Sequence, residues 1–142
     1  MKPYVFNVAQ ITDSCIKWIQ EWMSKNGNES TKVVIGISGG KDSTVVAALC
    51  AKAIGKERIL GVMMPNGIQP DISDSQKIVD FLQIPHITVN INNAYNGLTE
   101  EIKSKLDLES LSPQYLTNTP ARLRMTTLYG IGAIIGNARV VN

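Results

Sequence analysis

Residues 38–43, with the sequence Ser-Gly-Gly-Lys-Asp-Ser, have the composition of a phosphate-binding loop. Gly39 and Gly40 can adopt positive φ angles and let an anion approach the backbone closely. The hydroxyl groups of Ser38 and Ser43 add hydrogen-bond donors. A helix beginning after the loop would add the partial positive charge of its N-terminus. The loop therefore predicts an anion-binding nest suited to phosphate.

Asp42 places a carboxylate inside this nest, where it would repel a phosphate unless a cation lay between them. We therefore expect Asp42 to hold Mg²⁺ that bridges to the phosphates. The Walker A pattern is excluded because Asp42, rather than Ser or Thr, follows Gly40-Lys41, and the glycine spacing excludes the dinucleotide-binding GxGxxG. Lys41 could contact phosphate or be an ordinary exposed lysine. The alternative for the whole loop is a plain strand-to-helix turn in which Asp42 caps the helix.

The elements around the loop follow from hydrophobic periodicity. Residues 32–37 form a β-branched run that predicts a buried parallel strand. Residues 45–54 are apolar nearly all round and stop at Gly55, which predicts a buried helix. Upstream, apolar residues at helical spacing over 8–22 predict a helix that ends near Gly27.

The remaining chain continues the alternation of strands and helices. Strands are predicted at residues 58–64, 86–91 and 138–141, and helices after Asp71, over 93–106 and from Thr119, with 107–118 as a polar loop. This order predicts an α/β fold of three layers, a parallel sheet with right-handed crossovers and helices on both faces. Ligands bind at the carboxyl ends of strands in such sheets, where the 38–43 loop lies.

Composition and charge narrow the class of protein. A chain of 142 residues, 44% hydrophobic and 18% charged, fits one ordinary globular domain. A net charge of +2 gives no reason to expect nucleic acid or a membrane as partner. Cys15 and Cys50 form no CxxC pair, and neither a signal peptide nor a membrane span is evident, so a cytoplasmic protein is expected.

Three motifs together resemble one enzyme family. Residues 38–43 resemble the pyrophosphate loop of the N-type ATP pyrophosphatases, which split ATP between its α- and β-phosphates. Residues 64–75, beginning Met-Pro-Asn-Gly-Ile-Gln, and residues 118–129, with Arg122-x-Arg124-Met125, are similar to segments of ammonia-dependent NAD synthetases. The resemblance runs from about Thr31 onwards and implies the Rossmann-like fold of the adenine nucleotide α-hydrolases.

The resemblance implies a reaction and roles for particular residues. ATP would adenylate the carboxylate of deamido-NAD and release pyrophosphate, and ammonia would then displace AMP to give NAD⁺. Asp42 would hold Mg²⁺, Arg122 would bind deamido-NAD, and Arg124, Gln69 and Tyr129 would be secondary contacts. The implied ATP-binding residues are Gly36, Ile37, Ser38, Gly39, Gly40, Lys41, Asp42, Ser43 and Met63.

The resemblance also bears on domain organisation and assembly. We expect a single ATP-pyrophosphatase domain over residues 1–142, truncated at its C-terminus because the family's later site residues would follow Asn142, with a helical segment at 1–27. A homodimer is implied, with Gly130, Gly132 and Gly136 either in its interface or packed on the sheet. Two alternatives stay open: another N-type ATP pyrophosphatase, such as a GMP synthetase-type or tRNA-modifying enzyme, and a non-catalytic ATP-binding fragment.

Three aromatic or imidazole side chains have less specific expectations. Trp18 and Trp22 lie one helical turn apart and are expected in the core or an interface. His86, which follows Pro85 at a predicted strand start, is expected to be structural rather than catalytic.

Overall fold

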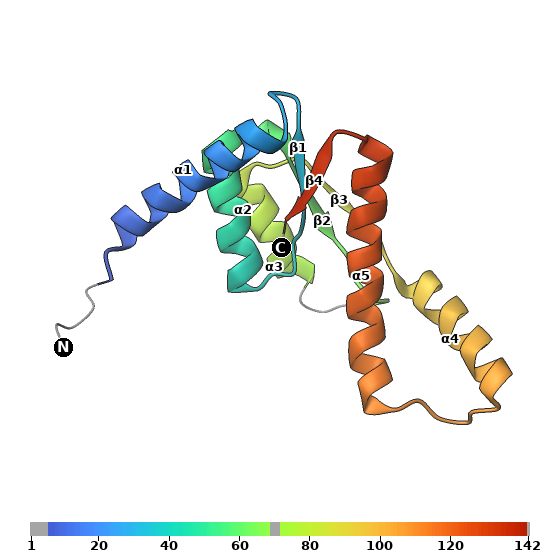
Figure 1. Ribbon diagram of the computed structural model, residues 1–142. Helices are drawn as coiled ribbons and strands as arrows, with labels where there is room; N and C mark the ends of the chain where they lie inside the picture. Colours follow the sequence, from blue (N-terminus) through green and yellow to red (C-terminus); the bar gives the residue numbers. More distant parts are fainter. Residues whose placement is uncertain (1–5, 69–71, 142) are drawn as a thin grey trace, which may run out of the picture.

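A four-stranded parallel sheet organises the molecule (Figure 1). The computed structural model describes residues 6–68 and 72–141, so the expectations for Gln69, Asp71 and Asn142 lie outside the described residues. The strands are β1 (Lys32–Gly36), β2 (Ile59–Met63), β3 (His86–Thr88) and β4 (Ala138–Val141), in the order β3-β2-β1-β4. The predicted parallel α/β architecture is confirmed.

The central strand is apolar because both of its faces are covered. Val33, Val34 and Ile35 of β1 are almost fully buried, as expected when helices pack on both sides of a parallel sheet. Val33 belongs to one hydrophobic core, and Val34 belongs to the other. Successive side chains of a strand point to opposite faces, and one short run therefore serves two cores.

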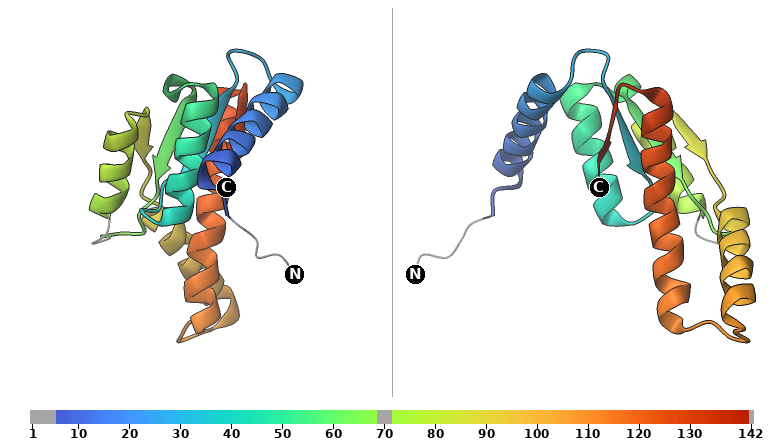
Figure 2. Two further views of the ribbon diagram at one scale, coloured as in Figure 1. Left: turned by 90° about the vertical axis from the view of Figure 1, so that its left-hand side faces the viewer. Right: turned by 45° about the vertical axis from the view of Figure 1, so that its right-hand side comes forward.

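The helices divide between the two faces of the sheet (Figure 2). On one face, α2 (Lys41–Ile54) and α3 (Ile72–Leu82) cover the strands, and α1 (Val8–Asn26) packs against α2. On the other face, α5 (Pro113–Ile135) packs on β1 and β4, and α4 (Asn92–Leu106) packs beside α5. A 3₁₀ turn, η1 (Lys56–Arg58), leads into β2.

The last helix begins earlier than the sequence predicted. Residues 113–118 belong to α5 rather than to a loop, and Pro120 lies inside the helix instead of in its first turn. Ser112 caps the true N-terminus by accepting a hydrogen bond from the Tyr115 N–H at 3.2 Å, and Pro113 occupies the first turn. The buried Pro120 is tolerated because the rest of α5 packs on the sheet.

Three other expectations need correction. The α2 helix starts at Lys41 and buries only Ala47 and Cys50 fully, with Val45 exposed, so it is not buried all round. The strand predicted at 86–91 ends at Thr88. Trp18 is 64% exposed and Trp22 is 37% exposed, which excludes the core for both and leaves the expectation of an interface as a prediction.

A polar network joins the amino ends of β1 and β4, opposite the end where a ligand is expected. The Thr31 hydroxyl donates to the Asn137 side-chain oxygen at 2.9 Å, and the Asn137 amide donates to Asn28 Oδ1 at 3.0 Å. Arg58 donates from Nε to the Thr31 carbonyl at 3.0 Å. Thr31 is fully buried, and these bonds satisfy its polar atoms.

Candidate functional site

The loop between β1 and α2 is held by its own serines. Ser38 Oγ and Ser43 Oγ lie 3.1 Å apart, the Gly40 N–H donates to Ser38 Oγ at 3.3 Å, and Ser43 Oγ donates to the Gly40 carbonyl at 3.1 Å. Gly39 has φ +82°, a conformation that glycine adopts without strain. The sequence reasoning placed this turn correctly between a strand and a helix.

The loop leads directly into the N-terminus of α2. Gly40 is the N-cap residue and supplies no side-chain cap. Within the described part of the chain, the N–H groups of Lys41 and Asp42 find no acceptor. Such unpaired donors carry the positive end of the helix dipole and bind anions. The loop and the first turn of α2 thus present unpaired N–H groups that favour an anion, and the binding of phosphate there stays a prediction.

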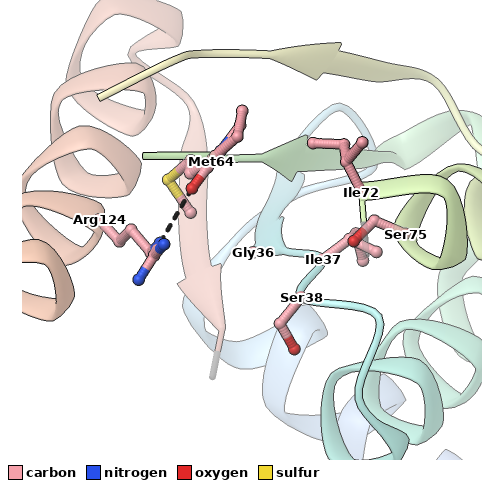
Figure 3. Close-up of a pocket in the computed structure, with 8 residues that line it drawn as sticks. Gly36, Ile37, Ser38, Met64, Ile72, Ser75 and Arg124 are labelled. Atoms are coloured by element: carbon pink, nitrogen blue, oxygen red, sulfur yellow. Dashed lines mark hydrogen bonds between the residues drawn. The ribbon is translucent and has the colours of Figure 1, made fainter. Parts of the chain in front are cut away.

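A cavity of about 370 Å³ opens beside this loop (Figure 3). It lies between the carboxyl ends of β1 and β2, the start of α3 and the middle of α5. Its lining combines loop backbone and hydroxyl groups with apolar side chains and one guanidinium group. The lining residues are Gly36, Ile37, Ser38, Met64, Pro65, Ile72, Ser75 and Arg124.

The two methionines at the end of β2 point in different directions. Met63 is 2% exposed and packs in the core under α1, α2 and α3. Met64 lines the cavity, and its Cε would lie 3.2 Å from a Cβ built on Gly36. The sequence reasoning named Met63, whose side chain is not in the cavity. The sequence reasoning also expected Met64 beside the adenine, with backbone groups of both residues reading its edge, and only the Met64 side chain lines the cavity.

The two arginines of α5 also differ. Arg124 Nε donates to the Met64 carbonyl oxygen at 2.9 Å, which holds the guanidinium at the cavity wall (Figure 3). Its terminal nitrogens make no hydrogen bond to the described residues. Arg122 is exposed and does not line the cavity. The stronger sequence expectation was for Arg122, and Arg124 was given a secondary place.

Three residues of the cavity lining had no function assigned to them from the sequence. They are Pro65, Ile72 and Ser75. Pro65 follows Met64, so the carboxyl end of β2 was a usable signal for it. Ile72 and Ser75 come from the start of α3, whose contact with the loop is tertiary. Only the folded chain shows that Asp74 and Ser75 lie against Gly39.

The donor set at the loop fits a magnesium ion that arrives with a phosphate ligand. Asp42 is exposed in the first turn of α2. Among residues 6–68 and 72–141, no group of three or more His, Cys, Asp or Glu side chains could hold a metal by itself. Mg²⁺ is commonly held by one or two carboxylates together with substrate phosphates and water, so a single carboxylate beside a phosphate nest is an adequate protein contribution.

Comparison with known proteins gives consistent matches. The family model described as NAD synthase matches residues 11–140. The NH(3)-dependent NAD(+) synthetase of Pyrococcus horikoshii is 36% identical over 124 residues, 87% of this chain and 46% of that protein. The corresponding synthetase of Carboxydothermus hydrogenoformans is 36% identical over 124 residues, 87% of this chain and 49% of that protein. The chain therefore spans about half the length of the curated relatives it matches.

Solved structures agree with the sequence matches. The NH3-dependent NAD synthetase from Campylobacter jejuni superposes with a TM-score of 0.82 at 28% identity, covering 96% of this chain and 56% of that chain. The NMN synthetase from Francisella tularensis superposes with a TM-score of 0.78 at 28% identity, covering 96% and 54%. The expected Rossmann-like adenine nucleotide α-hydrolase fold is confirmed by these neighbours.

Proposed function

The chain belongs to the NAD synthase family, and from that premise we propose that it binds ATP for the amidation of deamido-NAD with ammonia. The carboxylate of deamido-NAD attacks the α-phosphorus of ATP, and the bond to the β-phosphate breaks to release pyrophosphate. Ammonia then attacks the acyl carbon of the adenylate, loses a proton, and displaces AMP to leave NAD⁺. The open N-terminus of α2 beside the cavity is the observation that carries this proposal.

The loop's part in this reaction is electrostatic. Negative charge grows on the leaving pyrophosphate as its bond to the α-phosphorus breaks. The unpaired N–H groups of Lys41 and Asp42 would stabilise that charge, and the hydroxyls of Ser38 and Ser43 would join them by exchanging the hydrogen bonds that now hold the loop. Residues 36–43 would together surround the phosphates, and Gly36 and Ile37 line the adjoining cavity.

Asp42 would hold Mg²⁺ at the phosphates, and the ion would offset charge on the leaving group. The exposed position of Asp42 leaves its carboxylate accessible to an ion that arrives with ATP. Lys41, also exposed, lies in the same helical turn and can add positive charge to the nest.

The apolar side of the cavity suits adenine. Met64 and Pro65 provide a flat, polarisable surface for a purine ring. Met63 can contribute only through its backbone, and its carbonyl already accepts a hydrogen bond from the Val89 N–H at 2.9 Å. We therefore assign the side-chain contact with adenine to Met64.

The arginines of α5 suit the second substrate. Arg124 presents its unpaired terminal nitrogens at the cavity, where they can bind a carboxylate or phosphate in a bidentate manner. Arg122, exposed on the same helix, would bind deamido-NAD outside the cavity. Both roles need a substrate that extends from the loop along α5.

The proposal includes a homodimer in the cytoplasm, with residues 1–142 contributing one ATP-pyrophosphatase domain and with neither nucleic acid nor membrane as partner. Gly130 and the exposed Ile134 lie one turn apart on one side of α5, and Met125 and Tyr129 are exposed on another side of the helix. A side chain added at Gly130 would meet nothing within 4 Å, whereas Gly132 already packs near Val140 of β4. The exposed side at Gly130 and Ile134 supports close approach of a second copy. Every described helix falls short of the length or apolar character that a membrane crossing requires.

Two other readings of the same loop are less well supported. The family match favours a NAD synthetase over a GMP synthetase-type or tRNA-modifying ATP pyrophosphatase. A non-catalytic ATP-binding module would bind ATP without turnover.

The test is product formation from Mg-ATP, deamido-NAD and ammonium. We expect AMP, pyrophosphate and NAD⁺ in equal amounts, with turnover lost in Asp42→Asn because the variant keeps the side-chain shape and removes the charge. Pyrophosphate release that needs no deamido-NAD, or turnover unchanged in Asp42→Asn, would contradict the proposal. ATP binding without any product would identify the non-catalytic module.

A further inference from the structure

Ser75 is a buried residue whose hydroxyl lines the cavity and has no hydrogen-bond partner among the described residues. The residue is 2% exposed and lines the cavity. Its oxygen makes no hydrogen bond to any residue in the described ranges, 6–68 and 72–141. Buried hydroxyl groups are nearly always paired because an unpaired one costs free energy. The Ser75 hydroxyl makes no such pair within the described residues and faces the cavity, so it is available to a ligand there.

The hydroxyl lies directly against the phosphate loop. A Cβ built on Gly39 would be 3.4 Å from Ser75 Oγ and 3.4 Å from the Ser75 backbone nitrogen. Figure 3 shows Ser75 on the α3 side of the cavity, facing the segment that carries Ile37 and Ser38. Two helix N-termini, those of α2 and α3, thus converge on the same glycine.

The nearest charge on α3 does not prevent an anion from binding there. Asp74 precedes Ser75 in the first turn of α3, and its Cβ would lie 3.3 Å from a Cβ built on Gly39. Its carboxylate is 2.8 Å from Lys77 Nζ and its side chain is 57% exposed. The Asp74 charge is therefore paired and solvated, while the Ser75 hydroxyl has no partner among the described residues.

We propose that Ser75 donates a hydrogen bond to a phosphoryl oxygen of the nucleotide held by residues 38–43, so that the start of α3 forms a second wall of the phosphate nest. This role rests on the proposed binding of ATP at that loop. Ser75 is a binding and positioning residue, since its hydroxyl pairs only when phosphate is present. The unliganded protein keeps the unpaired hydroxyl because the bound state uses it.

This role predicts opposite effects on stability and affinity when the hydroxyl is removed. In Ser75→Ala the unliganded protein loses an unpaired buried polar group and nothing else, so its unfolding temperature should stay the same or rise. The affinity for phosphate should fall, because a hydrogen bond to a charged group is lost. A hydroxyl that merely served folding would lower stability instead.

The experiment measures Kd for Mg-ATP and for Mg-pyrophosphate by calorimetry, with the full chain, Ser75→Ala and Ser73→Ala. Ser73 is an exposed serine in the same turn and is the matched control. We expect Kd for both ligands to rise about ten- to a hundred-fold in Ser75→Ala. Ser73→Ala should bind like the wild type, and the unfolding temperature of ligand-free Ser75→Ala should be no lower than that of the wild type.

Each other result overturns the assignment. If the wild type binds pyrophosphate and Ser75→Ala binds it equally well, Ser75 does not contact the phosphate. The proposed function would then still stand. A lower unfolding temperature with weaker binding would make Ser75 structural. Wild-type protein that binds neither ATP nor pyrophosphate would overturn the Ser75 role and the proposed function together.

Discussion

At the scale of single residues, Gly39 limits what the phosphate loop can tolerate. Its φ of +82° disfavours any residue with a side chain. A Cβ there would also lie 3.3 Å from Asp74 Cβ, so that side chain would have to shift by a few tenths of an ångström. The backbone conformation favours glycine, and the contact with α3 adds to that preference.

Gly39→Ala should weaken Mg-ATP binding by more than about tenfold, because the loop must shift to relieve both the strain and the contact. Gly97→Ala is the matched control, since Gly97 lies within α4 and a Cβ there would meet nothing within 4 Å. The control should bind ATP normally and should be about 0.5–1 kcal/mol more stable, because alanine favours the helix. Titration calorimetry and urea unfolding distinguish these outcomes. Normal binding by Gly39→Ala would show that the loop does not hold the ligand through this conformation.

The two cysteines should differ in reactivity. Burial raises the pKa of the Cys50 thiol, and the Cys15 thiol is partly exposed. Only the thiolate reacts, so with Ellman's reagent near pH 8 we expect one fast thiol and a second that reacts only as the chain unfolds. The Cys15→Ser variant should lose the fast phase. A fast phase that persists in that variant would contradict the burial of Cys50.

The raised pKa of Cys50 makes the stability of the folded protein depend on pH in a defined direction. Because the pKa of Cys50 is raised in the folded state, its contribution to stability is fully present below the ordinary thiol pKa of 9.0. That contribution is lost as the pH rises from 9.0 through the folded pKa, since the unfolded chain ionises first.

At the scale of elements, the network of Thr31, Asn137 and Asn28 fixes β4 beside β1. The buried Thr31 hydroxyl bonds to Asn137 at 2.9 Å and also approaches Asn28 Oδ1 at 3.2 Å. The site at the opposite end of the sheet depends on this register, because β1 leads into the loop and α5 leads into β4.

Thr31→Val should lower the free energy of unfolding by about 1–3 kcal/mol, because it keeps the side-chain shape and removes the hydrogen bonds of a buried hydroxyl to Asn28 and Asn137. Thr117→Val is the control. Thr117 is exposed, and its hydroxyl only donates to the Pro113 carbonyl of its own helix. Urea unfolding should show a change within about 0.5 kcal/mol for the control. Equal effects of the two changes would mean that the network adds no stability.

The sequence predicted the elements better than their boundaries. β1 and β2 were predictable because β-branched and apolar runs of that length between turn residues have few other uses. The start of α5 was not, because Pro120 looks like a helix start and only packing on the sheet shows that the helix continues through it. Local propensity yields to burial in such cases.

In the candidate site, too, the local part was predictable from the sequence and the part made by tertiary packing was not. The loop at 38–43 was predictable because its glycines and serines are contiguous and act through their own backbone. Met64, Ser75 and Arg124 come from three different elements. Their convergence depends on strand pairing and helix packing, which the sequence does not encode at any single position.

At the scale of the whole molecule, the exposed apolar face of α5 bears on assembly. Ile134 is 88% exposed and lies one turn after Gly130, which is exposed on the same side of the helix. Patches of this kind commonly mark protein interfaces. The dimer proposed above would cover this face and leave the phosphate loop, between β1 and α2, open to solvent.

Sedimentation should show twice the chain mass for the wild type and the monomer mass for Ile134→Glu, because a charge in the interface would be costly to bury. Phe81→Glu is the control, since Phe81 is 85% exposed on α3, which packs on the other face of the sheet. It should remain dimeric. A wild-type chain that sediments as a monomer at all concentrations would remove α5 as a dimer interface.

ATP binding and turnover are separable at this scale, since the chain spans about half the length of its curated relatives. The binding proposed above uses the loop, the first turn of α2 and the cavity, all of which lie within the described residues. Turnover also needs deamido-NAD and ammonia to be placed correctly. Binding is therefore the property that depends most directly on the described geometry.

The most direct measurement is a calorimetric titration of the chain with ATP, with and without Mg²⁺, repeated with Asp42→Asn. We predict binding that is tighter with Mg²⁺, that pyrophosphate displaces, and that loses its dependence on Mg²⁺ in Asp42→Asn. No binding, or binding that is equally tight without Mg²⁺ and in the variant, would contradict a magnesium-assisted phosphate site at residues 36–43.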